Sequence, residues 1–329
     1  ILFDSNTQAL SVLNKGSYII IGNSDGGAKK YDSDMNEIWT IDDNNADNPV
    51  KIKEHSDGTI YLLSSDKIAK YSSSGSLEWG NDLNMDQARD FILVDDGIII
   101  GGHKSIDSWN SYLATEKLSY SDGSSIWIKE HTAYTSNNWK VYYPNASIFQ
   151  SSSGDIFFAS DNKFMKFTSS EPIPSWVKGL SSGWVHQAAI SPNDEIILIK
   201  DTGSQDNHYE LYDLSGNLIS SQRISALQGS SPSGIYRYTL SSTVSNDGVF
   251  YAVTYDGDWG GLDLIKYDGS DLTAFRRIEL YSTNQIGWSN LGEMYYPASI
   301  DVDSETVIHI FNFKNNLFNS QSRVPLLIK

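Results

Sequence analysis

A short polar turn between two segments rich in β-branched and aromatic residues recurs seven times along this chain of 329 residues. The first turn, Asn14-Lys15-Gly16, is typical, because polar residues and glycine tolerate the positive φ angles that tight hairpins require. One marker residue per turn gives the series Gly16, Gly58, Gly97, Gly154, Glu195, Gly248 and Glu305. Successive markers are 39 to 57 residues apart, which is the length of a repeated unit of four β-strands with loops of variable length.

Two further signals run in phase with the turns. The first is a strand ending in Tyr or Phe, followed by a polar turn and a strand that carries a large ring, as in Trp39, Trp79, Trp127 and Trp176. Such rings are expected to fill the wedge between neighbouring units. The second is a group of small residues just before each hairpin, with residues 50–51 as the exception. Small side chains are expected where strands crowd around a central axis.

Together these signals predict an all-β fold, a seven-bladed β-propeller in which four-stranded antiparallel blades surround a channel. The N-terminal strand, residues 1–4, is expected to complete the last blade, with Phe3 in the place that Trp occupies in other repeats. Such a closure removes an exposed sheet edge. The chain is therefore interpreted as a single domain. The expected blades span residues 5–42, 43–84, 85–131, 132–180, 181–224, 225–280 and 281–329 together with 1–4.

The composition narrows the classes of partner. With 41 Asp and Glu against 24 Lys and Arg, the net charge is −17, which disfavours nucleic acid and anionic membranes. No apolar run of the sequence approaches the ~18 residues of a membrane span. The chain has no cysteine, so disulfides and thiolate metal sites are excluded. Acidic, cysteine-free chains are common outside the cell, and we expect an extracellular or cell-surface protein with flanking domains in a larger chain.

Residues 31–39 and 71–79, each a Tyr, a polar turn and a Trp, resemble the PQQ-like repeat of quinoprotein-type propellers. The likeness covers about four of the seven repeats. It implies a propeller in which the Trp of each repeat docks between blades, and it leaves the chemistry open. Nothing resembles the vicinal disulfide or the calcium and base residues of quinoprotein dehydrogenases. We therefore interpret the chain as a non-quinone member of this superfamily.

The ligand surface is expected on the face that carries the loops leading into the innermost strands and those joining the second and third strands. These loops are long and aromatic in repeats three to seven, including residues 103–109, and short in the first two. Trp and Tyr rings stack on sugars, and short polar side chains fix the hydroxyls. We predict a non-catalytic, lectin-like module that binds carbohydrate in an adhesion protein. The predicted ligand-binding residues are Trp109, Trp139, Tyr143, Trp184, His186, His208, Tyr236, Trp259, Trp288 and Tyr296.

Two alternative functions stay open. In a lyase acting on acidic polysaccharide, His186 or Tyr238 would serve as the base and Arg237 would neutralise a uronate carboxylate. In a protein-interaction scaffold, an apolar patch on one face would bind a partner protein. The discriminating feature is the set of loop aromatics, which a carbohydrate ligand requires and a scaffold does not.

A metal site is the last candidate. Asp256, Asp258 and Asp263 lie close together in the sequence around a glycine-rich turn, and carboxylate oxygens are the ligands that Ca²⁺ prefers. Residues 32–37 also have the alternating oxygens of a calcium-binding loop, but they lack its Gly and its distant bidentate Glu, which leaves Asp256, Asp258 and Asp263 as the better candidate. The sequence therefore predicts either no cofactor or Ca²⁺ at these residues.

Overall fold

The computed structural model describes residues 9–23, 27–42, 45, 49–106, 110–135, 146–180, 184–191, 193–201, 207–223, 237–244, 249–256, 261–267, 272–279, 299–302, 307–314 and 323–328. Within these residues the protein is all β. Its 27 strands form six four-stranded sheets and one three-stranded sheet, all antiparallel.

The strands divide among the sheets in sequence order. The first two sheets consist of β1 (Ala9–Asn14), β2 (Tyr18–Asn23), β3 (Ala28–Asp32), β4 (Glu37–Ile41) and of β5 (Lys51–Glu54), β6 (Ile60–Leu63), β7 (Lys67–Tyr71), β8 (Leu77–Asp82). The third and fourth consist of β9 (Gln87–Val94), β10 (Gly97–Ser105), β11 (Asn110–Leu118), β12 (Ser125–Thr135) and of β13 (Ala146–Gln150), β14 (Ile156–Ser160), β15 (Lys163–Phe167), β16 (Trp176–Gly179). The fifth and sixth consist of β17 (Trp184–Ile190), β18 (Ile196–Asp201), β19 (Asn207–Tyr212), β20 (Leu218–Arg223) and of β21 (Arg237–Val244), β22 (Phe250–Asp256), β23 (Gly261–Tyr267), β24 (Leu272–Glu279). The seventh has β25 (Ser299–Val302), β26 (Val307–Lys314) and β27 (Arg323–Ile328).

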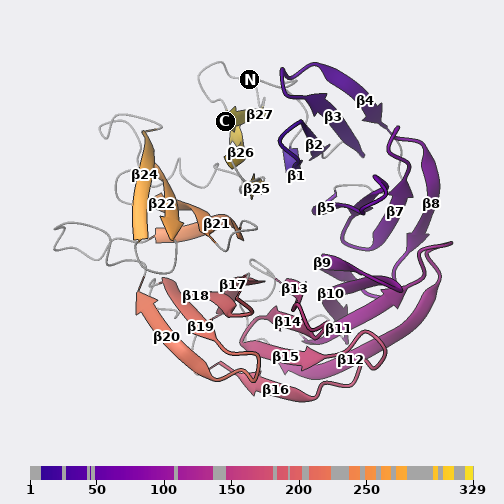
Figure 1. Ribbon diagram of the computed structural model, residues 1–329, viewed down its shortest axis with the longest axis vertical. Coiled ribbons are helices and arrows are strands. Elements are labelled where there is room, and N and C mark those ends of the chain that lie inside the picture. Colours follow the sequence, from indigo (N-terminus) through magenta and orange to yellow (C-terminus); the bar gives the residue numbers. More distant parts are fainter. Residues whose placement is uncertain are drawn as a thin grey trace.

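Each sheet is an antiparallel meander, and the sheets are arranged around a common centre with their first strands innermost (Figure 1). Every innermost strand contacts the innermost strand of the next sheet, and β1 also contacts β25 of the last one. The predicted all-β architecture of four-stranded antiparallel units is confirmed. The fourth strand expected for the last sheet, residues 1–4, lies outside the described residues. The third sheet is longer than expected, since β12 runs to Thr135, past the approximate boundary at residue 131.

The hairpin turns lie where the sequence placed them. Those marked by Gly16, Gly58, Gly97 and Gly154 each join the first and second strands of a sheet. In the fifth turn Asp194 adopts a positive φ of 58° in place of glycine. The turns predicted at residues 246–248 and 303–305 lie outside the described residues.

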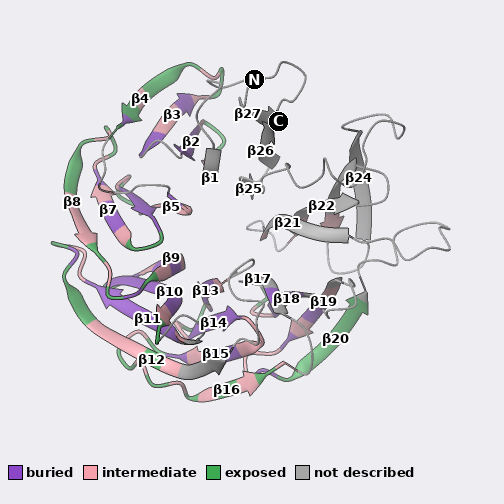
Figure 2. Ribbon diagram, turned by 180° about the vertical axis from the view of Figure 1, so that it is seen from behind, coloured by how far each residue is buried: buried purple, intermediate pink, exposed green. Residues whose placement is uncertain are grey.

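The hydrophobic core lies between consecutive sheets. On β6, Ile60 and Leu62 pack with residues of the first sheet, while Tyr61 and Leu63 pack with residues of the third. This alternation follows from the two-residue period of a strand, and β6 is buried throughout because both faces of its sheet are covered. Figure 2 shows how burial changes across each sheet: the inner strands are buried, and much of the outermost strands is exposed.

Large rings close the outer part of these interfaces. The indole nitrogen of Trp79 on β8 donates to the carbonyl of Tyr120, 3.1 Å away in the turn between β11 and β12 of the next sheet. Trp39 on β4 makes the equivalent bond to Ser73, at 3.2 Å. Gly123 in the β11–β12 turn has a φ of +69°, and a Cβ there would lie 2.6 Å from the Trp79 ring. Only glycine allows both the conformation and the close approach, so the predicted role of these rings as wedges is confirmed.

Small polar side chains join the innermost strands near the centre. The Ser11 hydroxyl on β1 donates to the carbonyl of Pro49, 2.8 Å away, just before β5. The Ser147 hydroxyl on β13 accepts a hydrogen bond of 2.9 Å from the backbone nitrogen of Ala188 on β17. Small side chains therefore let neighbouring strands approach closely enough for direct hydrogen bonds, as the sequence predicted.

Lys51, an exception to the small-residue pattern, is matched by a charge in the next sheet. Its Nζ lies 4.0 Å from Oδ1 of Asp90 on β9, and the Nζ of Lys53 lies 3.4 Å from the same oxygen. Asp90 Oδ2 accepts a hydrogen bond of 3.2 Å from the backbone nitrogen of Ile148 on β13. One buried carboxylate thus connects the second, third and fourth sheets.

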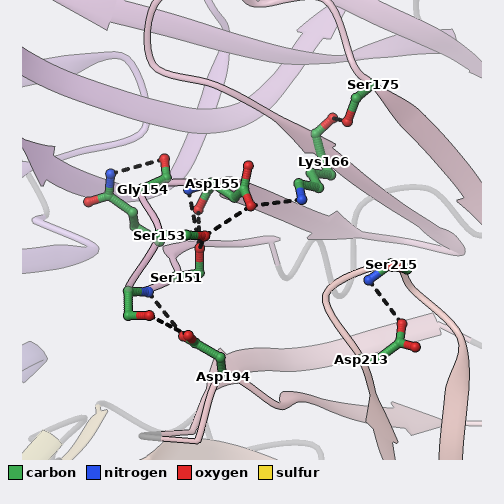
Figure 3. A network of polar contacts seen from close by, with 11 residues as sticks. Ser151, Ser153, Gly154, Asp155, Lys166, Ser175, Asp194, Asp213 and Ser215 are labelled. Carbon is green, nitrogen blue, oxygen red and sulfur yellow. Dashed lines mark hydrogen bonds and ion pairs between the residues drawn. The ribbon is translucent and has the colours of Figure 1, made fainter.

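The hairpin turns also connect neighbouring sheets on one face of the ring (Figure 3). The backbone nitrogen of Ser152 donates to Oδ1 of Asp194, 3.0 Å away in the next sheet, and the Ser152 hydroxyl donates to Oδ2. Within the fourth sheet, Asp155 forms an ion pair of 2.7 Å with Lys166. This face is therefore fixed by short polar contacts.

Trp79 and Trp127 provide a matched test of the wedge. Trp79→Phe is expected to lower the free energy of unfolding by about 1 kcal/mol more than Trp127→Phe, because it deletes an indole hydrogen bond, whereas Trp127 Nε1 has no partner among the described residues. Urea unfolding of both variants measures the difference. Equal losses would show that the indole bond does not hold the sheets together.

Candidate functional site

The innermost strands all begin on the face opposite the hairpin turns, where the second strand of each sheet ends and the third begins. We call this side the loop face. The third sheet extends furthest toward it. Its strands have 8, 9, 9 and 11 residues, against 4, 4, 5 and 6 in the second sheet. Because both sheets start from equivalent hairpin turns, the extra residues lie at the loop-face end.

Three of the ten predicted ligand-binding residues lie in described strands. Trp184 is the first residue of β17, and His186 occupies a β-bulge two residues later. His208 lies near the start of β19, where its Nδ1 is 3.4 Å from the Ser221 hydroxyl. The other seven lie outside the described residues: Trp109, Trp139, Tyr143, Tyr236, Trp259, Trp288 and Tyr296.

The residues predicted for a lyase lie on two neighbouring strands. Arg237 and Tyr238 begin β21, and β21 contacts β17, which carries His186. Both strands begin on the loop face. The fold thus places these two segments side by side.

The predicted calcium residues that the structure describes lie at the same end of the sixth sheet, because Asp256 is directly opposite Arg237 in the register of β21 and β22. Asp256 ends β22, Asp263 lies opposite Thr254 in β23, and Asp258 lies outside the described residues. Within the described ranges, no group of three His, Asp or Glu side chains is arranged to hold a metal ion.

A polar group lies between the third and fourth sheets, and the sequence did not predict it. It consists of Arg89, His103, Ser160, Asp161 and Asn162, and we call it the junction cluster. The loop expected at residues 103–109 is wrong at its start, since His103 belongs to β10 and is buried. Nε2 of His103 lies 3.2 Å from the Ser160 hydroxyl and 4.0 Å from Asp161 Oδ2. Asp161 Oδ2 and Asn162 Oδ1 are buried and accept no hydrogen bond from any described residue. Because these atoms are covered, the cluster supports the loop face rather than contacting a ligand directly.

The turn between β14 and β15 holds the cluster in place. The carbonyl of Asp161 accepts a hydrogen bond of 2.6 Å from Val185, and the carbonyl of Asn162 accepts one of 2.8 Å from Leu180. Val185 lies between Trp184 and His186 at the start of β17. The junction cluster is therefore bonded through the main chain to a segment that carries two predicted ligand residues.

The second sheet contains an equivalent turn that makes the same two main-chain bonds, although Asp161 has a positive φ of 52° and Ser65 does not. There the carbonyls of Ser65 and Asp66 accept hydrogen bonds of 2.6 and 2.8 Å from Ala88 and Leu83. Both Ser65 and Asp66 are exposed, whereas the Asp161 side chain is only 12% exposed. The two main-chain bonds thus do not themselves require a buried acid, and both the burial of Asp161 and its positive φ are specific to the fourth sheet.

Burial shifts the pKa values of two residues of this cluster, His103 and Asp161. It lowers the pKa of His103 to about 4, with the positive charge of Arg89 adding to the effect, and it raises the pKa of Asp161 to about 6. At neutral pH His103 is therefore neutral and Asp161 is ionised. The two groups, 4.0 Å apart, are therefore not an ion pair at neutral pH.

The junction between these two sheets concentrates unpaired polar atoms. Among the described residues, six buried side-chain nitrogen or oxygen atoms have no hydrogen-bond partner, and five of them belong to the third and fourth sheets: Arg89 Nε, Trp127 Nε1, His131 Nδ1, Asp161 Oδ2 and Asn162 Oδ1. Such atoms cost free energy, of order 1–3 kcal/mol each. Their gathering at one junction marks it as a functional candidate. The sequence signal for this cluster comes from comparing equivalent positions of the repeats, because Asp161 stands where the second repeat has Ser65.

Comparison with known proteins supports the fold. No protein-family model and no curated protein matches the chain. Among solved structures, it is similar to a streptogramin B lyase, with 12% identity and a TM-score of 0.60 over 99% of this chain and 94% of that one. It is also similar to the C-terminal WD40 domain of Sif2 (11%, TM-score 0.60, 98% and 82%) and to BamB from Moraxella catarrhalis (10%, TM-score 0.58, 100% of both).

At these identities the likeness shows the fold alone, and it defines the class: the protein is a β-propeller. In the part of the chain that the structure describes, we find no helix long and apolar enough to cross a membrane.

The second buried histidine of the third sheet gives a test of the electrostatics. His131 Nε2 lies 2.8 Å from the Thr115 hydroxyl, and burial, with the charge of Lys129, lowers its pKa from 6.5 to about 4. The stability that this neutral histidine contributes is complete above pH 6.5 and is lost as the pH falls toward 4.

Between pH 7 and 5, His131 is expected to cost the native state about 2 kcal/mol. His131→Gln should remove this component, because the amide can keep a hydrogen bond to Thr115 and does not titrate. Urea unfolding at the two pH values measures it. An identical loss of stability in wild type and variant would contradict the assignment.

Proposed function

We propose that this protein is a non-catalytic binding module that recognises carbohydrate on the loop face. The observation that carries the proposal is the placement of β17 and β21, two neighbouring innermost strands that both begin on this face. Their first residues include Trp184, His186 and Tyr238. These are the residue types that stack on sugar rings and bond hydroxyl groups.

The long third sheet supports an off-centre ligand surface. Its strands β10, β11 and β12 extend to the loop-face end and border residues 107–109 and 136–145. Those segments contain Trp109, Trp139 and Tyr143 of the predicted set. A wall of strands beside aromatic loops is a rigid support for a binding surface.

We further propose that the ring is a seven-bladed propeller closed by residues 1–4, and that it is a non-quinone relative of the PQQ-like repeat proteins. The contact of β1 with β25 and β26 supports closure. The docking of Trp39 and Trp79 on the next sheet supports the likeness, because the repeat implies such a Trp. An adhesion protein at the cell surface or outside the cell is the setting that this function fits.

Trp184 tests the proposal. On a glycan array and in calorimetric titration with the glycans that bind, Trp184→Ala is expected to weaken affinity at least tenfold, through loss of a stacking ring. Ile219→Ala is the control, because Ile219 is 54% exposed on the outermost strand β20. Repeating the titration with EDTA tests whether Ca²⁺ contributes. An array without binding to acidic or neutral glycans would refute the carbohydrate proposal.

A protein-interaction scaffold is the second candidate, and it rests on the outermost strands. In each of the first five sheets this strand presents an exposed apolar side chain: Ile38, Leu77, Ile126, Val177, Leu218 and Ile219. Exposed apolar positions repeated around a rim favour protein contacts. A partner bound there should be lost when Ile126 and Ile219 are replaced by Ser and retained in Trp184→Ala. The reverse pattern would place the partner on the loop face.

A further inference from the structure

His103 and Asp161 face each other across the junction of the third and fourth sheets without completing a hydrogen bond. His103 is 6% exposed and comes from β10, while Asp161 opens the turn after β14. Nε2 of His103 is bonded to Ser160 at 3.2 Å and lies 4.0 Å from Asp161 Oδ2. That oxygen has no hydrogen-bond partner among the described residues.

None of the charged groups named below fills the gap between His103 Nε2 and Asp161 Oδ2. From β9, Arg89 acts on His103, and its Nη2 donates to Gln87 Oε1 at 3.2 Å. Lys104, next along β10, is held by Glu130 at 2.7 Å. Lys163 begins β15 and forms no ion pair with Asp161 in the described part of the chain. The backbone nitrogen of Asp86, just before β9, donates to the carbonyl of His103 at 3.1 Å, and Asp86 Oδ2 accepts from the backbone nitrogen of Ser105. From β17, His186 follows Val185, which is bonded to the Asp161 carbonyl.

We propose that His103 and Asp161 form a proton-operated latch between the third and fourth sheets. In the open latch neutral His103 is the Nδ1–H tautomer, whose Nε2 accepts from the Ser160 hydroxyl and has no hydrogen to donate to Asp161. One proton taken up from solvent by the pair then completes a hydrogen bond between the imidazole Nε2 and the carboxyl Oδ2. The proton resides either on the carboxyl group, which then donates to the imidazole, or on the imidazole, which then donates to the carboxylate. Both arrangements carry the same total charge and join the two sheets at the same place.

The free energy of the buried carboxylate favours uptake of a proton by the pair at weakly acidic pH. At neutral pH the latch holds a buried carboxylate whose Oδ2 is unpaired, which is unfavourable in a medium of low polarity. Burial raises the pKa of the Asp161 carboxyl from 3.8 to about 6, so this group by itself stabilises the folded protein most below pH 4 and loses that effect as the pH rises through 6. His103 acts in the opposite sense, because its pKa is lowered from 6.5 to about 4 and its contribution is lost as the pH falls toward 4. The two contributions offset each other in the total stability, so the latch is measured by the coupling between the two groups.

The latch reaches the loop face through the main chain. The carbonyl of Asp161 is bonded to Val185 at 2.6 Å, between Trp184 and His186. Closing the latch therefore fixes the start of β17. That this changes affinity for a ligand rests on the proposed function, whereas the latch itself is a property of the protein alone.

A double-mutant cycle tests the latch in the absence of any ligand. Asp161→Asn is suitable because Asn, like Asp, tolerates the positive φ of 52° at this position. It is combined with His103→Gln, and unfolding by urea is followed at pH 7.5 and pH 5. The coupling between the two sites, expressed as a ratio of unfolding equilibrium constants, is expected to be at least tenfold larger at pH 5. Equal coupling at the two pH values would overturn the proposal.

The control cycle pairs Asp161→Asn with His131→Gln, a buried histidine of the same sheet that bonds Thr115 instead. Its coupling should be the same at both pH values. A pH-dependent coupling there would mean that acid acts on the whole sheet rather than through the latch.

Ring resonances of His103 in the wild-type protein give a second measurement that needs no stable double variant. They are expected to shift with a midpoint near pH 6, and Asp161→Asn should abolish that transition. Resonances that stay constant from pH 7.5 to 5 would refute the latch. Neither measurement involves a glycan, so failure of the latch and failure of carbohydrate binding are distinguishable.

Discussion

The contact between neighbouring sheets is the interaction on which the rest of this fold depends. A four-stranded sheet has two apolar faces, and no sheet can bury both without a neighbour on each side. The contact also changes character with distance from the centre. Near it, Ser11 and Ser147 are small enough for side chains to bond the next strand directly. Further out the sheets diverge, and rings such as Trp79 fill the wider gap against Gly123. The size of each interface side chain thus follows from its distance from the centre, because the gap between neighbouring sheets widens outward.

The junction of the third and fourth sheets departs from this scheme. It contains apolar packing, including Ile148, Phe158 and Met165, yet it also holds most of the unpaired polar atoms found in the described residues. A purely structural interface would replace such groups by apolar ones at little cost or with a gain. Natural sequences depart from local consistency chiefly where function requires it. The third sheet, on one side of this junction, also has the longest of the described strands, β12 with 11 residues.

The repeats could be predicted from the sequence because they are local signals: a turn residue, a ring such as that of Trp79, and small residues at fixed spacing. Contacts between repeats were harder to predict. Lys51 departed from the pattern when its own repeat was considered, and its partner Asp90 lies in the next repeat. His103 and Asp161 are similarly separated, since their proximity depends on the register of two sheets and on how these pack. The predicted ligand residues came from loop composition, which identifies a surface without specifying its geometry.

For the carbohydrate-binding module that we propose, the arrangement of charges favours a neutral saccharide over an acidic polymer. Nine lysines of the described residues form ion pairs with Asp or Glu: Lys15, Lys29, Lys51, Lys53, Lys70, Lys104, Lys117, Lys166 and Lys200. A paired lysine contributes little field at a distance, so the excess of 41 acidic over 24 basic residues dominates what an approaching polymer experiences. Close to the junction cluster the described cations are Arg89, Lys104 and Lys163, and Lys104 is already paired with Glu130. A uronate chain would therefore meet repulsion over most of its approach, whereas stacking of a neutral sugar on aromatic rings is insensitive to this field.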